Sequence, residues 1–237
     1  MLNWQNFWSN NPPLFGVVMQ KNSVYFADKL LKAKTILREN HILDFGCGPG
    51  FLADLLANKV ASYHGVDIST NCIETCQQQF ADYKNMRFSK IVSTENTTGL
   101  EALVQEGLQF DVIIILSVVQ YFSGLPKVAT LLSECKSMLS PGGKIILADV
   151  IPSNKGLLKD IYSGWMDSIQ KGYFFSFLRF LFQARFSNYH QLRMNNDLLC
   201  ITEPDIAVIC QQLQLQYTIM PTCTLQHSRV SYCITAL

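Results

Sequence analysis

The sequence predicts an α/β protein with a doubly wound, mostly parallel, seven-stranded sheet and a helical lid inserted after the fifth strand. Three observations predict this class. A short apolar strand runs directly into a glycine-rich turn at 46–50 and then into a helical pattern. Strand and helix patterns then alternate along the chain, as they do in parallel sheets. A nearly continuous apolar run at 110–117 suits a central strand buried on both faces.

The first strand, at 42–45, leads into the turn that we expect to bind a ligand. Gly46 and Gly48 let the backbone turn sharply and approach a ligand where a β-carbon would collide. The helix after the turn offers unpaired N–H groups at its start. Dinucleotide-binding turns read G-x-G-x-x-G, whereas here the third glycine, Gly50, comes one residue early and Asp44 precedes the first. The spacing therefore disfavours a nicotinamide oxidoreductase.

The second strand, at 63–67, ends in an acidic residue. Asp67 lies about 20 residues after the glycine turn, the offset at which a carboxylate meets the ribose hydroxyls of a bound nucleotide. The alternative is an aspartate that only caps the next helix, which we expect to begin at Ser69. The offset favours the ribose role.

Asp44 followed by Gly-x-Gly-x-Gly resembles motif I of the class I S-adenosylmethionine (SAM) dependent methyltransferases. The resemblance implies SAM as cofactor and S-adenosylhomocysteine (SAH) as product. It also implies that the loop after the third strand, at 86–92, contacts the adenine, although this chain has no aspartate at the start of that loop. The cofactor-binding residues that we expect are Asp44, Gly46, Cys47, Gly48, Gly50, Asp67, Ile68, Ser93, Thr94, Leu116 and Ser117.

The segment 117–122, after the fourth strand, resembles the methylation domains of nonribosomal peptide synthetases and related natural-product enzymes. This resemblance extends through an amphipathic helix at 125–139 and a Ser-Pro-Gly-Gly break to Gly143, and a fifth strand follows at 144–150. Tyr121 lies at the carboxyl end of the fourth strand, where ligands bind in open α/β sheets. The alternative for this side chain is packing at the start of a helix.

Two aromatic-rich segments flank these elements. Residues 1–40 are expected to form an N-terminal helical flap, with one helix before Pro12-Pro13 and a second that begins at Ser23. The simpler role for this flap is packing on the core, and the alternative role is covering the cofactor. Residues 153–200 form an insertion that we interpret as a helical lid over an apolar acceptor pocket. A last helix from Thr202 and two closing strands at 217–222 and 229–235, in a hairpin, complete the chain.

Composition limits the class of partner. The chain has 237 residues, enough for one domain over residues 1–237, and its 19 basic and 18 acidic residues create no field that attracts nucleic acid. No apolar stretch reaches the roughly 18 residues that a membrane span needs, and the start of the chain does not resemble a signal peptide. The eight cysteines contain no C-x-x-C pair, so we expect buried thiols in a cytoplasmic protein without a metal site.

These observations predict methyl transfer from SAM to an oxygen or nitrogen of a small, partly apolar metabolite, possibly a natural-product intermediate, either free or tethered to a carrier. His190 in the lid and Tyr121 are the candidate catalytic residues. Two alternatives stay open: a protein with the SAM-binding fold that transfers no methyl group, and a methyltransferase that acts on RNA or protein. The sequence leaves the acceptor, the methylated atom and the oligomeric state undecided.

Overall fold

The structure, a computed structural model, describes residues 16–152, 198–226 and 228–237. The expected first helix of the flap, nearly all of the expected lid, and His190 lie outside these residues.

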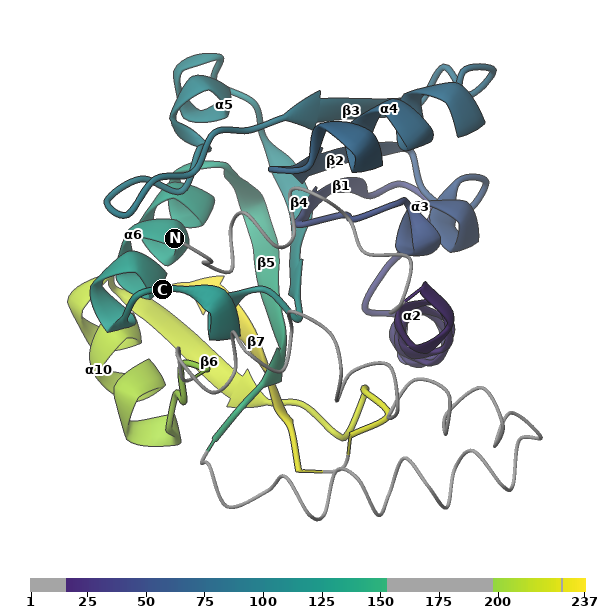
Figure 1. Ribbon diagram of the computed structural model, residues 1–237. Coiled ribbons are helices and arrows are strands. Elements are labelled where there is room, and N and C mark those ends of the chain that lie inside the picture. The colour runs from purple at the N-terminus through teal and green to yellow at the C-terminus, as the bar shows by residue number, and fades with distance from the viewer. Residues whose placement is uncertain (1–15, 153–197, 227) are drawn as a thin grey trace, which may run out of the picture.

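A seven-stranded sheet forms the centre of the molecule, in the order β3-β2-β1-β4-β5-β7-β6 (Figure 1). The neighbours from β3 to β5 are all parallel, and β7 is antiparallel to both β5 and β6. The predicted seven-stranded, mostly parallel sheet and the closing hairpin are therefore confirmed. The strands are β1 (His41–Phe45), β2 (Ser62–Asp67), β3 (Met86–Lys90), β4 (Phe110–Leu116), β5 (Leu139–Val150), β6 (Leu215–Ile219) and β7 (Val230–Ala236).

Helices cover both faces of the sheet (Figure 1). One layer contains α2 (Gly16–Lys32), α3 (Phe51–Leu56) and α4 (Thr70–Gln79), and the other contains α5 (Glu101–Gln105), α6 (Leu125–Ser137) and α10 (Glu203–Gln212). Successive residues of β4 point to opposite layers: Ile113 and Ile115 pack with α6, whereas Val112 and Ile114 pack toward α2 and α3. This double burial is the reason that β4 reads as an unbroken apolar run.

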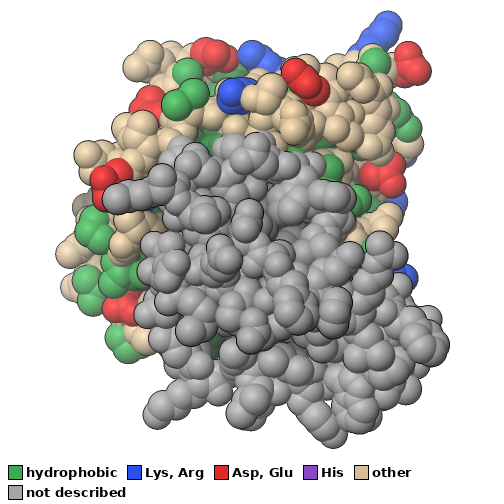
Figure 2. All heavy atoms as spheres, in the orientation of Figure 1, with side chains coloured by type: hydrophobic (Ala, Val, Ile, Leu, Met, Phe, Trp, Pro, Cys, Tyr) green, Lys and Arg blue, Asp and Glu red, His purple; other side chains and the backbone are tan. Residues whose placement is uncertain are grey.

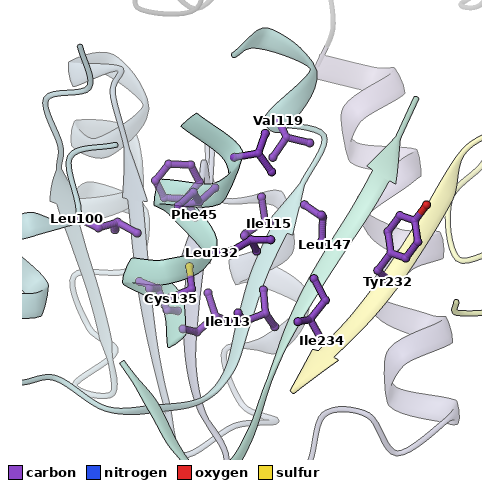
Figure 3. Packing of buried hydrophobic residues seen from close by; sticks show 14 of the residues in the cluster. Phe45, Leu100, Ile113, Ile115, Val119, Leu132, Cys135, Leu147, Tyr232 and Ile234 are labelled. Atoms are coloured by element: carbon purple, nitrogen blue, oxygen red, sulfur yellow. The ribbon is translucent and has the colours of Figure 1, made fainter. Parts of the chain in front are cut away.

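The larger of the two cores lies on the α6 side of the sheet. Figure 3 shows Ile113 and Ile115 of β4 and Leu147 of β5 facing Leu132 and Cys135 of α6. All five side chains are fully buried. The core thus occupies the middle of the strands and leaves polar groups to their ends.

Several expected boundaries were wrong. The first closing strand runs over Leu215–Ile219 instead of 217–222. Ser23 does not cap a helix, because α2 begins at Gly16 and Ser23 is buried within it. The third strand ends at Lys90 instead of residue 92. The expected break at 140–143 belongs to β5, which begins at Leu139 opposite Phe110, where the pairing with β4 has an irregular register. A β-carbon at Gly143 would lie 3.0 Å from the carbonyl oxygen of Phe110, so this close approach of the two strands requires glycine.

Surface features bear on partners. No described helix is long and apolar enough to cross a membrane. On the face that Figure 2 shows, the coloured acidic and basic side chains are interspersed, and they form no patch of one sign.

Gly65 in β2 provides a test of the packing against the α4 layer. A β-carbon there would lie 2.7 Å from Cδ1 of Phe88 and 3.0 Å from Sγ of Cys47. The ring of Phe88 has little freedom to move, because it stacks on Phe80 at 5.3 Å between centroids. We expect Gly65→Ala to lower the free energy of unfolding by about 1–3 kcal/mol, the usual cost of overpacking, as measured by urea denaturation.

The matched control is Gly16→Ala, because its new β-carbon would lie 3.9 Å from the nearest heavy atom, in the ring of Phe51. At the start of a helix this change is expected to leave the stability unchanged or to raise it by up to about 1 kcal/mol. Equal stability of the two variants would contradict the packing at Gly65.

Candidate functional site

The glycine turn after β1 adopts a backbone that other residues rarely adopt. Gly46, Gly48 and Gly50 have φ angles of 81°, 54° and 85°, all in the left-handed region. The N–H of Gly46 donates to the carbonyl of Val66 at 2.8 Å, which ties the turn to the end of β2. A β-carbon at Gly46 would lie 2.5 Å from Cγ2 of Val118, so the turn also packs tightly against the segment after β4.

Asp67 joins the turn to the second strand. One carboxylate oxygen accepts the N–H of Gly48 at 2.9 Å, and the other accepts the N–H of Ser69 at 2.8 Å. Burial raises the pKa of Asp67, while the N–H donors of Ser69, Gly48 and Ile68 oppose the rise. Asp67 thus helps to cap α4, the alternative that the sequence left open, and it also contacts the turn. Each carboxylate oxygen can accept a further hydrogen bond, so a diol can still bind.

Asp44 lies behind the turn with a partner that the sequence analysis missed. Its carboxylate accepts the hydroxyl proton of Tyr63, and both residues are buried. Burial raises the pKa of Asp44 to about 7, the hydrogen bond from Tyr63 opposes the rise, and the charge of Asp67 adds to it. A buried tyrosine hydroxyl needs a partner, but the sequence does not indicate which residue supplies it, because Tyr63 and Asp44 are 19 positions apart.

Cys47 holds the turn together from inside. Its N–H donates to Val66 at 3.1 Å, its carbonyl accepts the N–H of Gly50 at 3.2 Å, and its thiol donates to the carbonyl of Gly48 at 3.6 Å. The thiol of Cys76 donates to the same carbonyl at 3.4 Å. The hydrogen bond with Cys76 and burial raise the pKa of Cys47. Of the expected cofactor residues, Cys47 is therefore placed to shape the site without donating to a ligand.

The loop after β3 contains Ser93 and Thr94, the expected adenine contacts. The hydroxyl of Ser93 donates to the carbonyl of Thr97 at 3.0 Å, and the hydroxyls of Thr94 and Thr97 lie 2.9 Å apart. Lys127, in the first turn of α6, donates to the hydroxyl of Ser93 at 2.9 Å and to the carbonyl of Thr94. The sequence analysis missed Lys127, because a single lysine on a helix carries no signal of its own.

The carboxyl ends of β4 and β5 meet at a second polar pair. Ser117, which follows Leu116, donates its hydroxyl to a carboxylate oxygen of Asp149 at 2.6 Å. Their φ angles are 60° and 64°, in the left-handed region that residues other than glycine adopt infrequently. Tyr121 follows in the 3-10 helix η2 (Val119–Tyr121), and its side chain is half-buried. The structure thus brings Ser117 to the same edge of the sheet as the glycine turn.

Two of the four histidines lie at the opposite edge. His41 begins β1 and its Nδ1 lies 2.7 Å from the hydroxyl of Ser62, while Nε2 of His64 lies 2.9 Å from the hydroxyl of Ser89. Burial lowers the pKa of His64 to about 4, and the charge of Arg87 contributes. Both histidines line an open groove of about 320 Å³ at the amino ends of the strands. Both histidines are therefore remote from the glycine turn at the carboxyl ends of the strands, whereas His190 and His227 lie outside the described residues.

Taken together, the described residues fit a nucleoside that carries a charged amino acid. Asp67 can accept two ribose hydroxyls beside a turn in which Gly46, Gly48 and Gly50 have no β-carbon. Asp44 supplies a buried carboxylate close to the same turn, which suits a nearby cation. The neighbourhood of Asp44 and Asp67, adjacent in space through β1 and β2, therefore matches the ribose and amino-acid parts of SAM.

Comparison with known proteins supports this geometry. Residues 43–145 match the family model described as "Methyltransferase domain". The ubiquinone biosynthesis O-methyltransferase of Coxiella burnetii is 25% identical over 133 residues, which are 56% of this chain and 53% of that protein. Chondramide synthase cmdD of Chondromyces crocatus is 31% identical over 112 residues, which are 46% of this chain and 3% of the synthase. The chain thus spans about half the length of the ubiquinone biosynthesis enzyme that it matches.

A solved structure shows the same fold. The magnesium protoporphyrin IX methyltransferase ChlM of Synechocystis, with bound SAH, has a TM-score of 0.56 and 20% sequence identity, and the match covers 92% of this chain and 82% of that chain. The matched segment 43–145 contains the glycine turn, Asp67 and the segment after β4. By this match the segment 43–145 is similar to methyltransferase domains, and the chain has the fold of a solved methyltransferase that binds SAH.

Proposed function

We propose that this chain transfers the methyl group of SAM to an oxygen or nitrogen of a small, partly apolar metabolite. The observation that carries the proposal is the contact of Asp67 with Gly48, which joins the acidic end of β2 to the glycine turn at 2.9 Å. This contact places a diol acceptor next to a glycine of the turn, where no β-carbon obstructs a ligand. SAM, when bound, supplies a methyl group on a positively charged sulfur.

The described residues would each have a separate task on the cofactor side. Asp67 would accept the ribose hydroxyls, and the turn at 46–50 would let the amino-acid part approach the backbone. Asp44, held by Tyr63, would favour the positive charge of the amino group. Leu116 and Ser117 would border the amino-acid end from β4. Methyl transfer needs mainly alignment and exclusion of water, which such a set of fixed groups can provide.

The acceptor side would lie at the ends of β4 and β5. Asp149 and Ser117 form a fixed polar pair there, and Tyr121 follows closely in the chain. For a hydroxyl acceptor, a carboxylate in this place could take up the proton that is released. The proposed roles of His190 and Tyr121 in catalysis, and of 153–200 as a lid, rest on the sequence alone.

A small-molecule acceptor agrees with two of the relatives. One is named as an O-methyltransferase of ubiquinone biosynthesis, and the other is a chondramide synthase. The balance of 19 basic and 18 acidic residues also fits a small acceptor better than a nucleic acid. We further propose that residues 1–237 act as one cytoplasmic domain, with 1–40 as its flap.

The first prediction concerns Asp67. Because a ligand that binds only the folded state raises the melting temperature, SAM and SAH should stabilise the wild-type protein in a thermal-shift titration, and NADH should not. Asp67→Ala should weaken SAH binding at least tenfold, since it removes charged hydrogen-bond acceptors. Asp54→Ala is the control, because Asp54 is exposed in α3 and its loss changes the net charge equally. Stabilisation by NADH alone would contradict the proposed cofactor.

The second prediction concerns pH. The pKa of Asp44 is about 7 in the free protein, and a cation bound nearby would lower it. Binding would then release a proton, so the affinity for SAH should rise up to about tenfold from pH 6 to pH 8 and level off above that. Isothermal titration calorimetry at several pH values measures this dependence.

Two controls separate Asp44 from its neighbours. 5′-Methylthioadenosine has the same ribose as SAH but no amino group, so its affinity should change little with pH, and a pH dependence that both ligands share would be assigned to Asp67 instead. Burial keeps the pKa values of Tyr63 and Cys47 above their usual range, so neither group titrates between pH 6 and pH 8. Asp44→Asn should remove the dependence, and an unchanged dependence in this variant would assign it to another group.

A further inference from the structure

The loop after β3 begins beside Asp67, the residue proposed to hold the ribose. Lys90 at the end of β3 pairs with Asp67, and the N–H of Ile91 donates to the carbonyl of Asp67 at 3.0 Å. A base is attached directly to the ribose, so a base that extends toward β3 would contact the residues that follow these two strand ends. These residues are Ile68 after β2 and Val92 after β3.

The hydroxyl side chains of this loop already form hydrogen bonds with each other and with α6. Ser93 donates to the carbonyl of Thr97, Thr94 contacts Thr97 through their hydroxyls, and Lys127 bonds the hydroxyl of Ser93. At the far end of the loop, Thr98 donates its hydroxyl to Glu134 of α6. The loop is thus fixed on α6 by contacts at both ends, and its hydroxyl groups are used in doing so.

Val92 is the apolar exception in this loop. Its exposed fraction is 71%, and apart from Leu237 at the end of the chain no large apolar side chain among the described residues is as exposed. Its neighbour Ile91 is buried, so the loop presents Val92 outward at the edge where the site lies. Ile68, beside Asp67, is half-buried and packs on the core. Two branched apolar side chains therefore follow the paired ends of β2 and β3.

We propose that Ile68 and Val92 line the nucleobase site and that this site does not distinguish the group at position 6 of a purine. The proposal rests on the proposed function, since it takes the ligand to be a nucleoside held by Asp67. An apolar surface discriminates weakly between ligands that differ in one polar group, whereas a site that bonds this group discriminates strongly. The chain should therefore bind SAH and its deaminated analogue, S-inosylhomocysteine, with similar affinity.

The test is isothermal titration calorimetry with both ligands on the wild-type protein and on three variants. The wild type should prefer SAH over S-inosylhomocysteine by less than about fivefold. Val92→Asp should raise this preference about tenfold, because a carboxylate accepts a hydrogen bond from the 6-amino group and repels a 6-oxo group. The control is Val92→Asn, because asparagine has nearly the same shape as aspartate but can form a hydrogen bond with either a 6-amino or a 6-oxo group. The preference of this variant for SAH over S-inosylhomocysteine should stay near that of the wild type.

Glu95 could also cause a preference for SAH over S-inosylhomocysteine, because it is an exposed carboxylate in the same loop. Glu95→Gln should leave the wild-type preference unchanged. The inference would be overturned by a wild-type preference for SAH above about fivefold, by a loss of preference in Glu95→Gln, or by an unchanged preference in Val92→Asp. Absence of SAH binding to folded wild-type protein would overturn the proposed function itself, and the inference with it, so the two failures are distinguishable. The fold should survive the substitutions at Val92, because this side chain is mostly exposed.

Discussion

The hydrogen bond between the N–H of Gly48 and the carboxylate of Asp67 connects the two strand ends on which the site depends. A half-buried carboxylate is costly unless donors surround it, and here the donors are backbone groups of the turn and of the start of α4. The carboxylate therefore needs the turn in its left-handed form, and the turn needs the carboxylate to satisfy an N–H group. Each stabilises the other before any ligand arrives.

The apolar sheet explains why polar groups gather at one edge. The residues of β4 from Val112 to Ile115 are completely buried, because helices cover both faces of the sheet. A polar side chain in the middle of this strand would lose its water without gaining a partner. Ser117 and Asp149 therefore lie just past the apolar parts of β4 and β5, at the same edge as Asp44 and Asp67.

The sequence was sufficient for features that depend on neighbours along the chain. Glycine spacing, the offset of Asp67 and the alternation of strands and helices depend on local geometry, and they predicted the fold and the position of the turn. The start of α2 was wrong, because a serine that could cap a helix can also be buried within one, as Ser23 is. The strand at 140–143 was missed, because Pro141 and Gly142 indicate a turn, whereas the irregular pairing with Phe110 accommodates them.

Contacts between distant parts of the chain could not be predicted from the sequence. Tyr63 binds Asp44 and Lys127 binds Ser93 across 19 and 34 positions, and no local pattern specifies such pairs. They decide which of the expected residues are available: Ser93 and Cys47 use their polar groups within the protein, whereas Asp67 keeps the capacity to accept more hydrogen bonds. A motif thus identifies the place where a ligand binds, and the long-range contacts determine which atoms in that place can bind it.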